Sequence, residues 1–92
     1  MNDDNQDNTQ PAQQQDQPVI VYGAEWCAFC HTAMQYFDKK GVKYEYRDVE
    51  AKDEWLKESV DKSGQNGIPV LDFNGKIVVG FDRPKIDAAL AA

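Results

Sequence analysis

Apolar and polar residues alternate along residues 19–92 with two different spacings. Short β-branched and aromatic runs, which are typical of strands, occur at residues 19–22, 43–48, 70–73 and 76–79. Between and after these runs, apolar residues recur at the three- to four-residue spacing of helices, beginning near residues 27, 53 and 83. The pattern predicts the element order β-α-β-α-β-β-α.

The boundaries of the three helices are predicted from capping residues. Gly41 ends the first helix after two lysines, Asp53 caps or opens the second, Ser63-Gly64 closes it, and Asp82 caps the third. The residues expected to face inward are Cys30, Ala33 or Met34, and Phe37 in the first helix, Trp55, Leu56 and Val60 in the second, and Ile86, Ala89 and Leu90 in the third.

The connections between strands predict the sheet. A strand–helix–strand unit gives a parallel pair with a right-handed crossover, whereas Asn74-Gly75 is a strong signal for an antiparallel hairpin. We therefore expect an α/β fold with a four-stranded mixed sheet flanked by three helices.

Residues 1–18 differ from the rest of the chain. They are almost entirely Asn, Gln, Asp, Thr and Pro, with four acids, no base and no aromatic residue, so we expect a disordered acidic tail and a domain at 19–92. The formal charge of the chain is −6, and the domain accounts for only part of it, with twelve acids and ten bases. The domain has no basic stripe, so we do not expect nucleic-acid binding. Without an apolar span or a signal-peptide pattern, we expect a cytoplasmic protein with no membrane contact. We also expect a monomer.

The candidate chemistry lies at Cys27-Ala28-Phe29-Cys30, directly after a predicted strand and at the start of a predicted helix. The free N–H groups and partial positive charge of a helix N-terminus favour thiolate over thiol, which is the attacking species in disulfide exchange. This placement predicts that Cys27, at the exposed end, is the nucleophile. Cys30, one turn further and on the inward face, would be the resolving thiol.

Other interpretations of the two cysteines remain open. Cys30 could be a small core residue and Cys27 an ordinary surface thiol. A zinc site normally needs four ligands, and only His31 could add to the pair; we place His31 on the solvent side of its helix and expect no metal site within one chain.

Three further segments are candidate binding residues. Pro69, after Ile68, is either a cis proline that exposes the Ile68 backbone to an extended peptide or glutathione, or an ordinary trans proline at a strand start. Gly80 allows close backbone approach, and the helix start at Asp82 would favour a carboxylate ligand, although Asp82 alone is more often only a cap. We expect Trp26 and Phe29 to form an apolar rim for a substrate, with core packing as the alternative.

The residues from Tyr22 to Cys30, Gly67-Ile68-Pro69-Val70 and Gly80-Phe81-Asp82, in this order and spacing, resemble the glutaredoxins of the thioredoxin superfamily. The resemblance covers nearly all of residues 19–92. The runs at residues 63–70 and 79–82 most resemble small bacterial glutaredoxin-like proteins of the YruB type. Cys30-His31 and Gly80-Phe81 followed by Arg83-Pro84 resemble the NrdH redoxins.

This resemblance implies a thioredoxin fold with a cis Pro69, a nucleophilic Cys27 and a resolving Cys30. It also implies that glutathione, as co-substrate, lies along Ile68, with its γ-glutamyl end near Asp82 and its glycyl carboxylate near Gln65. Gly80 and Phe81 are further expected binding residues. The sequence departs from the family at Ala28-Phe29, where Pro-Tyr is usual, and at Ala24, where many members carry lysine. A missing cation and the adjacent Glu25 predict a higher Cys27 pKa than in a typical glutaredoxin.

The expected function is reduction of protein or glutathione mixed disulfides through the cysteine pair, with no bound cofactor. Glutathione or a flavoprotein disulfide reductase would regenerate the dithiol. One alternative is an NrdH-like redoxin reduced by thioredoxin reductase. Another is a module in which two chains share an iron–sulfur cluster through Cys27 and glutathione.

Overall fold

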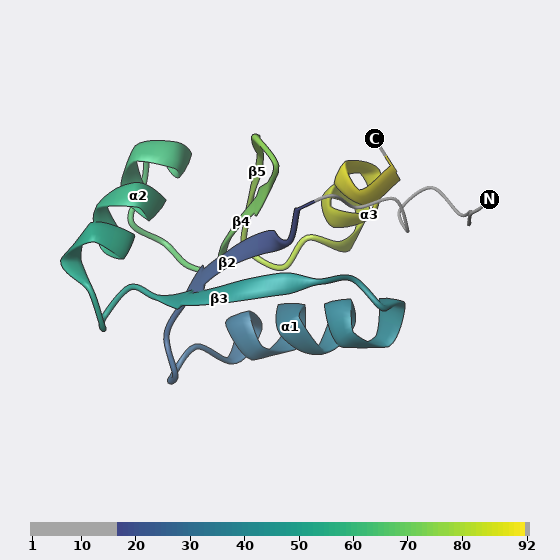
Figure 1. The fold of residues 1–92 in the computed structure, drawn as a ribbon, viewed down its shortest axis with the longest axis horizontal. Coiled ribbons are helices and arrows are strands. Elements are labelled where there is room, and N and C mark those ends of the chain that lie inside the picture. Colours follow the sequence, from purple (N-terminus) through teal and green to yellow (C-terminus); the bar gives the residue numbers. More distant parts are fainter. Residues whose placement is uncertain (1–16, 92) are drawn as a thin grey trace.

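The computed structural model describes residues 17–91, and the predicted tail therefore lies outside the described residues except for the exposed Gln17 and Pro18. The elements follow the predicted order (Figure 1). They are β2 (Val19–Gly23), α1 (Ala28–Lys40), β3 (Tyr44–Asp48), α2 (Asp53–Ser63), β4 (Val70–Phe73), β5 (Lys76–Val79) and α3 (Arg83–Ala91). No helix among residues 17–91 is long and apolar enough to cross a membrane.

The four strands form one mixed sheet in the order β3-β2-β4-β5. β2 pairs in parallel with β3, with Val19 opposite Tyr44, and antiparallel with β4, with Tyr22 opposite Val70. Asn74 and Gly75, both at positive φ, turn the chain from β4 into the antiparallel β5. The predicted four-stranded mixed sheet and hairpin are confirmed.

The two faces of the sheet have different covers, because successive strand residues point to opposite sides. Val21 and Leu71 face a core shared with Phe37 of α1 and Ile86 of α3. The opposite face carries Tyr22 and its neighbours, and α2 contacts it. Figure 1 shows α1 and α2 on opposite sides of β3.

The helix ends match the predicted boundaries. Gly41 and Gly64 end α1 and α2 in the left-handed conformation that glycine adopts without a steric penalty. The Asp82 Oδ1 atom accepts the backbone N–H of Lys85 at 3.2 Å, so Asp82 caps α3. Asp53 opens α2, but Lys52 occupies the N-cap position and makes no side-chain capping bond.

The expected inward face of α2 is wrong at Leu56. This side chain is 42% exposed, whereas the buried residue of the helix is Ser59. On the sheet face beneath α2, the Tyr22 hydroxyl donates to Glu58 and accepts from Lys62, so polar groups make part of the contact between helix and sheet. Because these hydrogen bonds help to hold the helix on the sheet, α2 can pack there without burying Leu56.

Candidate active site

The cysteine pair lies at the start of α1, where a loop from β2 meets the helix. Cys27 is the N-cap residue in an extended conformation, and its Sγ accepts the backbone N–H of Cys30 at 3.2 Å. The two residues form a disulfide, with their Cα atoms 5.3 Å apart. A sulfur at the N-cap occupies the position where a capping side chain satisfies an unpaired amide, so the helix terminus favours its anionic form.

The exposure of Cys27 is smaller than the sequence suggested. Cys27 is only 6% exposed in the disulfide, although it is still more accessible than Cys30, which is fully buried. The reason is packing: the two cysteines and Ala24 form a small buried cluster, and Ile68 packs against it. The expectation of an exposed Cys27 is therefore wrong for the oxidised protein, while its position on the outer side of the pair is confirmed.

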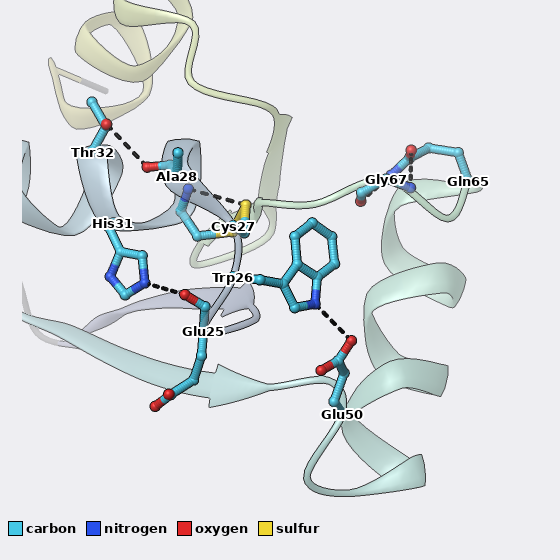
Figure 2. The surroundings of a disulfide bond; sticks show 10 residues. Glu25, Trp26, Cys27, Ala28, His31, Thr32, Glu50, Gln65 and Gly67 are labelled. Atoms are coloured by element: carbon cyan, nitrogen blue, oxygen red, sulfur yellow. Dashed lines mark hydrogen bonds between the residues drawn. A yellow bond between two sulfur atoms is a disulfide. The ribbon is translucent and has the colours of Figure 1, made fainter.

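Two aromatic side chains next to the pair face solvent, as expected. Trp26 is 69% exposed and Phe29 is 64% exposed. The Trp26 indole Nε1–H donates to Glu50 Oε2 at 2.8 Å, which fixes the ring beside the disulfide (Figure 2). Large exposed aromatic rings around a reactive pair form a surface that can bury apolar groups of a substrate.

A surface cleft of about 480 Å³ begins at the Trp26 ring and extends toward α2. Ile68, which touches the cysteine cluster, forms part of its wall, so the cleft lies beside the reactive pair. Its lining residues are Trp26, Val49, Glu50, Leu56, Asn66, Gly67 and Ile68.

Sequence reasoning did not single out Glu50, and it placed Leu56 in the core. A signal for Glu50 was present, because β2 and β3 are parallel and the residues that follow them meet at one edge of the sheet. Trp26 follows β2 and Glu50 follows β3, so the pairing of these strands places their two loops side by side. Exposure of Leu56 depends on how α2 contacts the assembled sheet and had no local signal.

The loop before β4 brings Ile68 and Pro69 to the cysteines. The Ile68–Pro69 peptide is cis, as the resemblance implied. The backbone N–H and C=O of Ile68 form no hydrogen bond within residues 17–91. Gly80 donates its N–H to the Pro69 carbonyl at 2.8 Å, so the segment after β5 is held next to this loop.

The other predicted binding residues have structural partners. Gln65 closes its own loop, accepting the Gly67 N–H at 2.5 Å and donating to the Gly67 carbonyl at 2.9 Å (Figure 2). Phe81 is half-buried and packs edge-on against Tyr36 with ring centroids 5.7 Å apart. Asp82 caps α3, as described above. Of the predicted residues, only Trp26 and Ile68 line the cleft.

His31 lies on the exposed side of α1, as expected. Its Nε2 is 2.7 Å from the Glu25 carbonyl oxygen, which ties the first turn of the helix to the preceding loop (Figure 2). Within residues 17–91, no three His, Cys, Asp or Glu side chains gather as a set that could hold a metal ion.

Comparisons with known proteins identify the family. The glutaredoxin family model matches residues 19–78. The chain is 31% identical over 72 residues to the glutaredoxin-like 8.6 kDa protein in the rubredoxin operon of Clostridium pasteurianum, covering 75% of this chain and 92% of that protein. It is 30% identical over 82 residues to a glutaredoxin of Pseudomonas aeruginosa, covering 82% and 98% of the two chains.

A solved structure agrees with the fold. The crystal structure of a glutaredoxin from Archaeoglobus fulgidus superimposes with a TM-score of 0.75 at 21% identity, covering 88% of this chain and 92% of that one. The paired cysteines at the start of α1, the thioredoxin fold around them and these matches lead to one conclusion: the chain belongs to the glutaredoxin family of thiol–disulfide oxidoreductases.

Proposed function

We propose that this protein reduces protein disulfides and glutathione mixed disulfides with Cys27 as the nucleophile and Cys30 as the resolving thiol. The observation that carries the assignment is the hydrogen bond from the Cys30 N–H to the Cys27 sulfur. Only Cys27 has its sulfur at the helix N-cap, where the unpaired amides stabilise a thiolate. Cys30, which is fully buried, receives no such assistance from solvent or from a cap.

The exchange proceeds in two balanced steps. The Cys27 thiolate attacks one sulfur of the substrate disulfide, a new bond forms between Cys27 and that sulfur, and the other substrate sulfur leaves as a thiolate that takes up a proton. Cys30 then loses its proton and attacks the Cys27 sulfur, which releases the second substrate thiol. The substrate gains two electrons, and the protein is left with the Cys27–Cys30 disulfide.

The dithiol must be regenerated by a thiol donor. We take glutathione as that donor because the chain belongs to the glutaredoxin family. The free backbone groups of Ile68 beside the cysteines support this proposal, since an extended peptide or glutathione could pair with them as an added strand. Contacts of glutathione with Gly80 and Asp82 belong to the same proposal. In it, no cofactor is bound, and the protein acts as a monomer in the cytoplasm.

A flavoprotein disulfide reductase is the second candidate donor. The exposed Trp26 and Phe29 rings favour it, because a protein partner buries large aromatic surfaces that a tripeptide leaves uncovered. Assays with glutathione plus its reductase and with thioredoxin reductase separate the two donors: turnover only with the latter would exclude glutathione.

The roles of the two cysteines can be tested by serine substitution. We expect Cys27→Ser to abolish disulfide exchange with every substrate, since no thiolate remains at the helix N-cap. We expect Cys30→Ser to retain part of the activity toward a glutathione mixed disulfide, because a second glutathione can replace the resolving thiol. Both variants are measured by steady-state reduction of a glutathionylated peptide.

Each variant replaces one sulfur by one oxygen, so the two form a matched pair and each is the control for the other. Thermal unfolding of both reduced variants checks that they are folded. Activity that survives in Cys27→Ser and disappears in Cys30→Ser would reverse the proposed roles.

A further inference from the structure

The cleft beside the cysteine pair has walls that are mainly apolar. Trp26 and Leu56, which are 69% and 42% exposed, both line it, and so does Ile68, which packs against the cysteine cluster. A ligand that covers exposed apolar groups lowers the free energy by about 25 cal/mol for each Å² of apolar surface removed from water. The cleft is therefore suited to an apolar side chain of a substrate.

The charge of the cleft is negative. Glu50 is the one charged side chain among its lining residues, which include no Lys, Arg or His. The Oε2 atom of Glu50 accepts the Trp26 indole N–H, and Oε1 has no hydrogen-bond or ion-pair partner among residues 17–91. One carboxylate oxygen thus fixes the aromatic wall, while the other is free to accept a hydrogen bond from a cation.

This combination does not match glutathione well. Glutathione carries two carboxylates, one ammonium group and no large apolar side chain, so in this cleft it would leave the apolar walls uncovered, and its net negative charge would be repelled by Glu50. A peptide segment with a bulky apolar residue and a basic residue near its disulfide cysteine would cover the walls and pair with Glu50.

We propose that the cleft selects protein disulfides whose cysteine is flanked by a bulky apolar residue and a basic residue, and that Glu50 is the specificity-determining residue. This inference rests on the proposed function, because it names the substrate class of the same cysteine pair. Glu50 acts twice, since it positions the Trp26 ring through one oxygen and attracts the substrate cation through the other.

The test uses three peptides of equal length, each with one cysteine joined by a disulfide to a chromogenic aryl thiol. The residues flanking the cysteine are leucine and lysine in the first, alanine and lysine in the second, and leucine and glutamate in the third. Release of the aryl thiol by excess reduced protein gives a second-order rate constant that does not depend on the electron donor. The glutathione–aryl disulfide is the fourth substrate.

We expect the leucine–lysine peptide to react roughly tenfold faster than the alanine–lysine peptide, from burial of the leucine side chain. We expect it to react about twofold to fivefold faster than the leucine–glutamate peptide, which is the range for a partly exposed ion pair. The second ratio should fall as ionic strength rises, because salt screens exposed charges.

Three variants separate the two actions of Glu50. Glu50→Gln keeps an oxygen for the indole N–H but loses the charge. The lysine–glutamate ratio, which is the rate constant of the leucine–lysine peptide divided by that of the leucine–glutamate peptide, should therefore fall to about one. The leucine preference, which is the faster reaction of the leucine–lysine peptide than of the alanine–lysine peptide, should be retained. Glu50→Ala loses both, and the leucine preference should fall as well. The matched control is Asp61→Asn on α2, which removes one charge outside the cleft lining and should leave both ratios unchanged.

Equal rates for the three peptides with the native protein would overturn the inference while leaving the proposed function intact. So would a lysine–glutamate ratio that persists in Glu50→Gln. Failure of the proposed function has a different signature: the reduced native protein would release aryl thiol from none of the four substrates, or Cys27→Ser would release it as fast as the native protein.

Discussion

The environment of Cys30 depends on a glycine that places no side chain against it. A Cβ atom on Gly23, the last residue of β2, would lie 2.8 Å from the Cys30 Sγ and 3.0 Å from its Cβ. Contacts of 2.8 Å are too short for carbon and sulfur, so the absence of a side chain at this position allows α1 to begin directly against the strand. Gly23 therefore sets how close the resolving thiol can lie to the sheet.

We predict that Gly23→Ala lowers the free energy of unfolding by about 1–3 kcal/mol, the usual cost of overpacking. Urea denaturation of the reduced protein measures this change. The same substitution in a Cys30→Ala background should cost less, because the closest contact atom is gone. Equal costs in the two backgrounds would show that the contact with the Cys30 sulfur is not the cause.

Tyr46 is a second residue whose role depends on its surroundings. Its ring packs against the core, and its hydroxyl oxygen is buried without a hydrogen-bond partner among residues 17–91. Burial raises the pKa of Tyr46, and the carboxylates of Asp48, Glu25 and Glu50 raise it further. The hydroxyl therefore stays protonated and adds no hydrogen bond to the folded state.

We predict that Tyr46→Phe leaves the free energy of unfolding unchanged or raises it by up to about 1 kcal/mol, since a buried hydroxyl without a partner is unfavourable. Tyr22→Phe is the matched control: the Tyr22 hydroxyl donates to Glu58 at 2.9 Å and accepts from Lys62 at 2.8 Å. The control should lose about 1–2 kcal/mol. Equal losses in the two variants would mean that the Tyr46 hydroxyl has a stabilising partner.

At the scale of elements, polar groups connect α2 to three strands of the sheet. Glu58 accepts from Tyr22 and also pairs with Arg47 of β3 at 2.6 Å, and Lys62 pairs with Asp72 of β4 at 2.7 Å. The hydrogen bond from Tyr22 lowers the pKa of Glu58, and the one from Arg47 adds to this effect against the opposing influence of burial. The stabilisation by ionised Glu58 is fully present above the ordinary pKa of a glutamate. It is lost as the pH falls through the lowered pKa of the folded protein.

We predict that the difference in unfolding free energy between the native protein and Glu58→Gln is greatest near pH 7 and narrows below pH 4.5, the ordinary pKa of the group. The difference at pH 7 should be about 1 kcal/mol or less, because the Glu58 side chain is 37% exposed and solvent screens the pair. Urea denaturation from pH 7 to pH 3 measures it, with Asp61→Asn as the control. A difference that is constant over this range would contradict the role of the ionised Glu58.

Sequence reasoning predicted the elements because each signal was local. The Gly41 cap, the Asn74-Gly75 turn and the Asp82 cap act within a few residues, and all three occur where expected. The orientation of α2 was not predictable in this way. Leu56 faces solvent because Glu58 and Lys62 find partners on β2, β3 and β4, and these partners are known only once the strands are assembled.

At the scale of the whole molecule, the active site lies where loops from one edge of the sheet converge. The loop after β2 supplies Cys27 and Trp26, the loop after β3 supplies Glu50, and the loop before β4 supplies Ile68. The cysteine motif and its place between strand and helix were visible in the sequence. The Trp26–Glu50 bond and the low exposure of Cys27 each depend on two of these loops meeting, and the cleft depends on all three, so only the folded chain reveals them.

Disulfide exchange by this protein requires that Cys27 is the reactive thiol of the reduced form. Its sulfur lies at the N-cap of α1 and toward the outer side of the pair, so ionisation and access both favour it over Cys30. The most direct measurement is timed alkylation of the reduced protein by iodoacetamide at pH 7, with mass spectrometry locating the modified cysteine. We expect Cys27 to be alkylated before Cys30 and faster than free cysteine. Alkylation of Cys30 first, or of Cys27 no faster than free cysteine, would show that Cys27 is not the activated thiol.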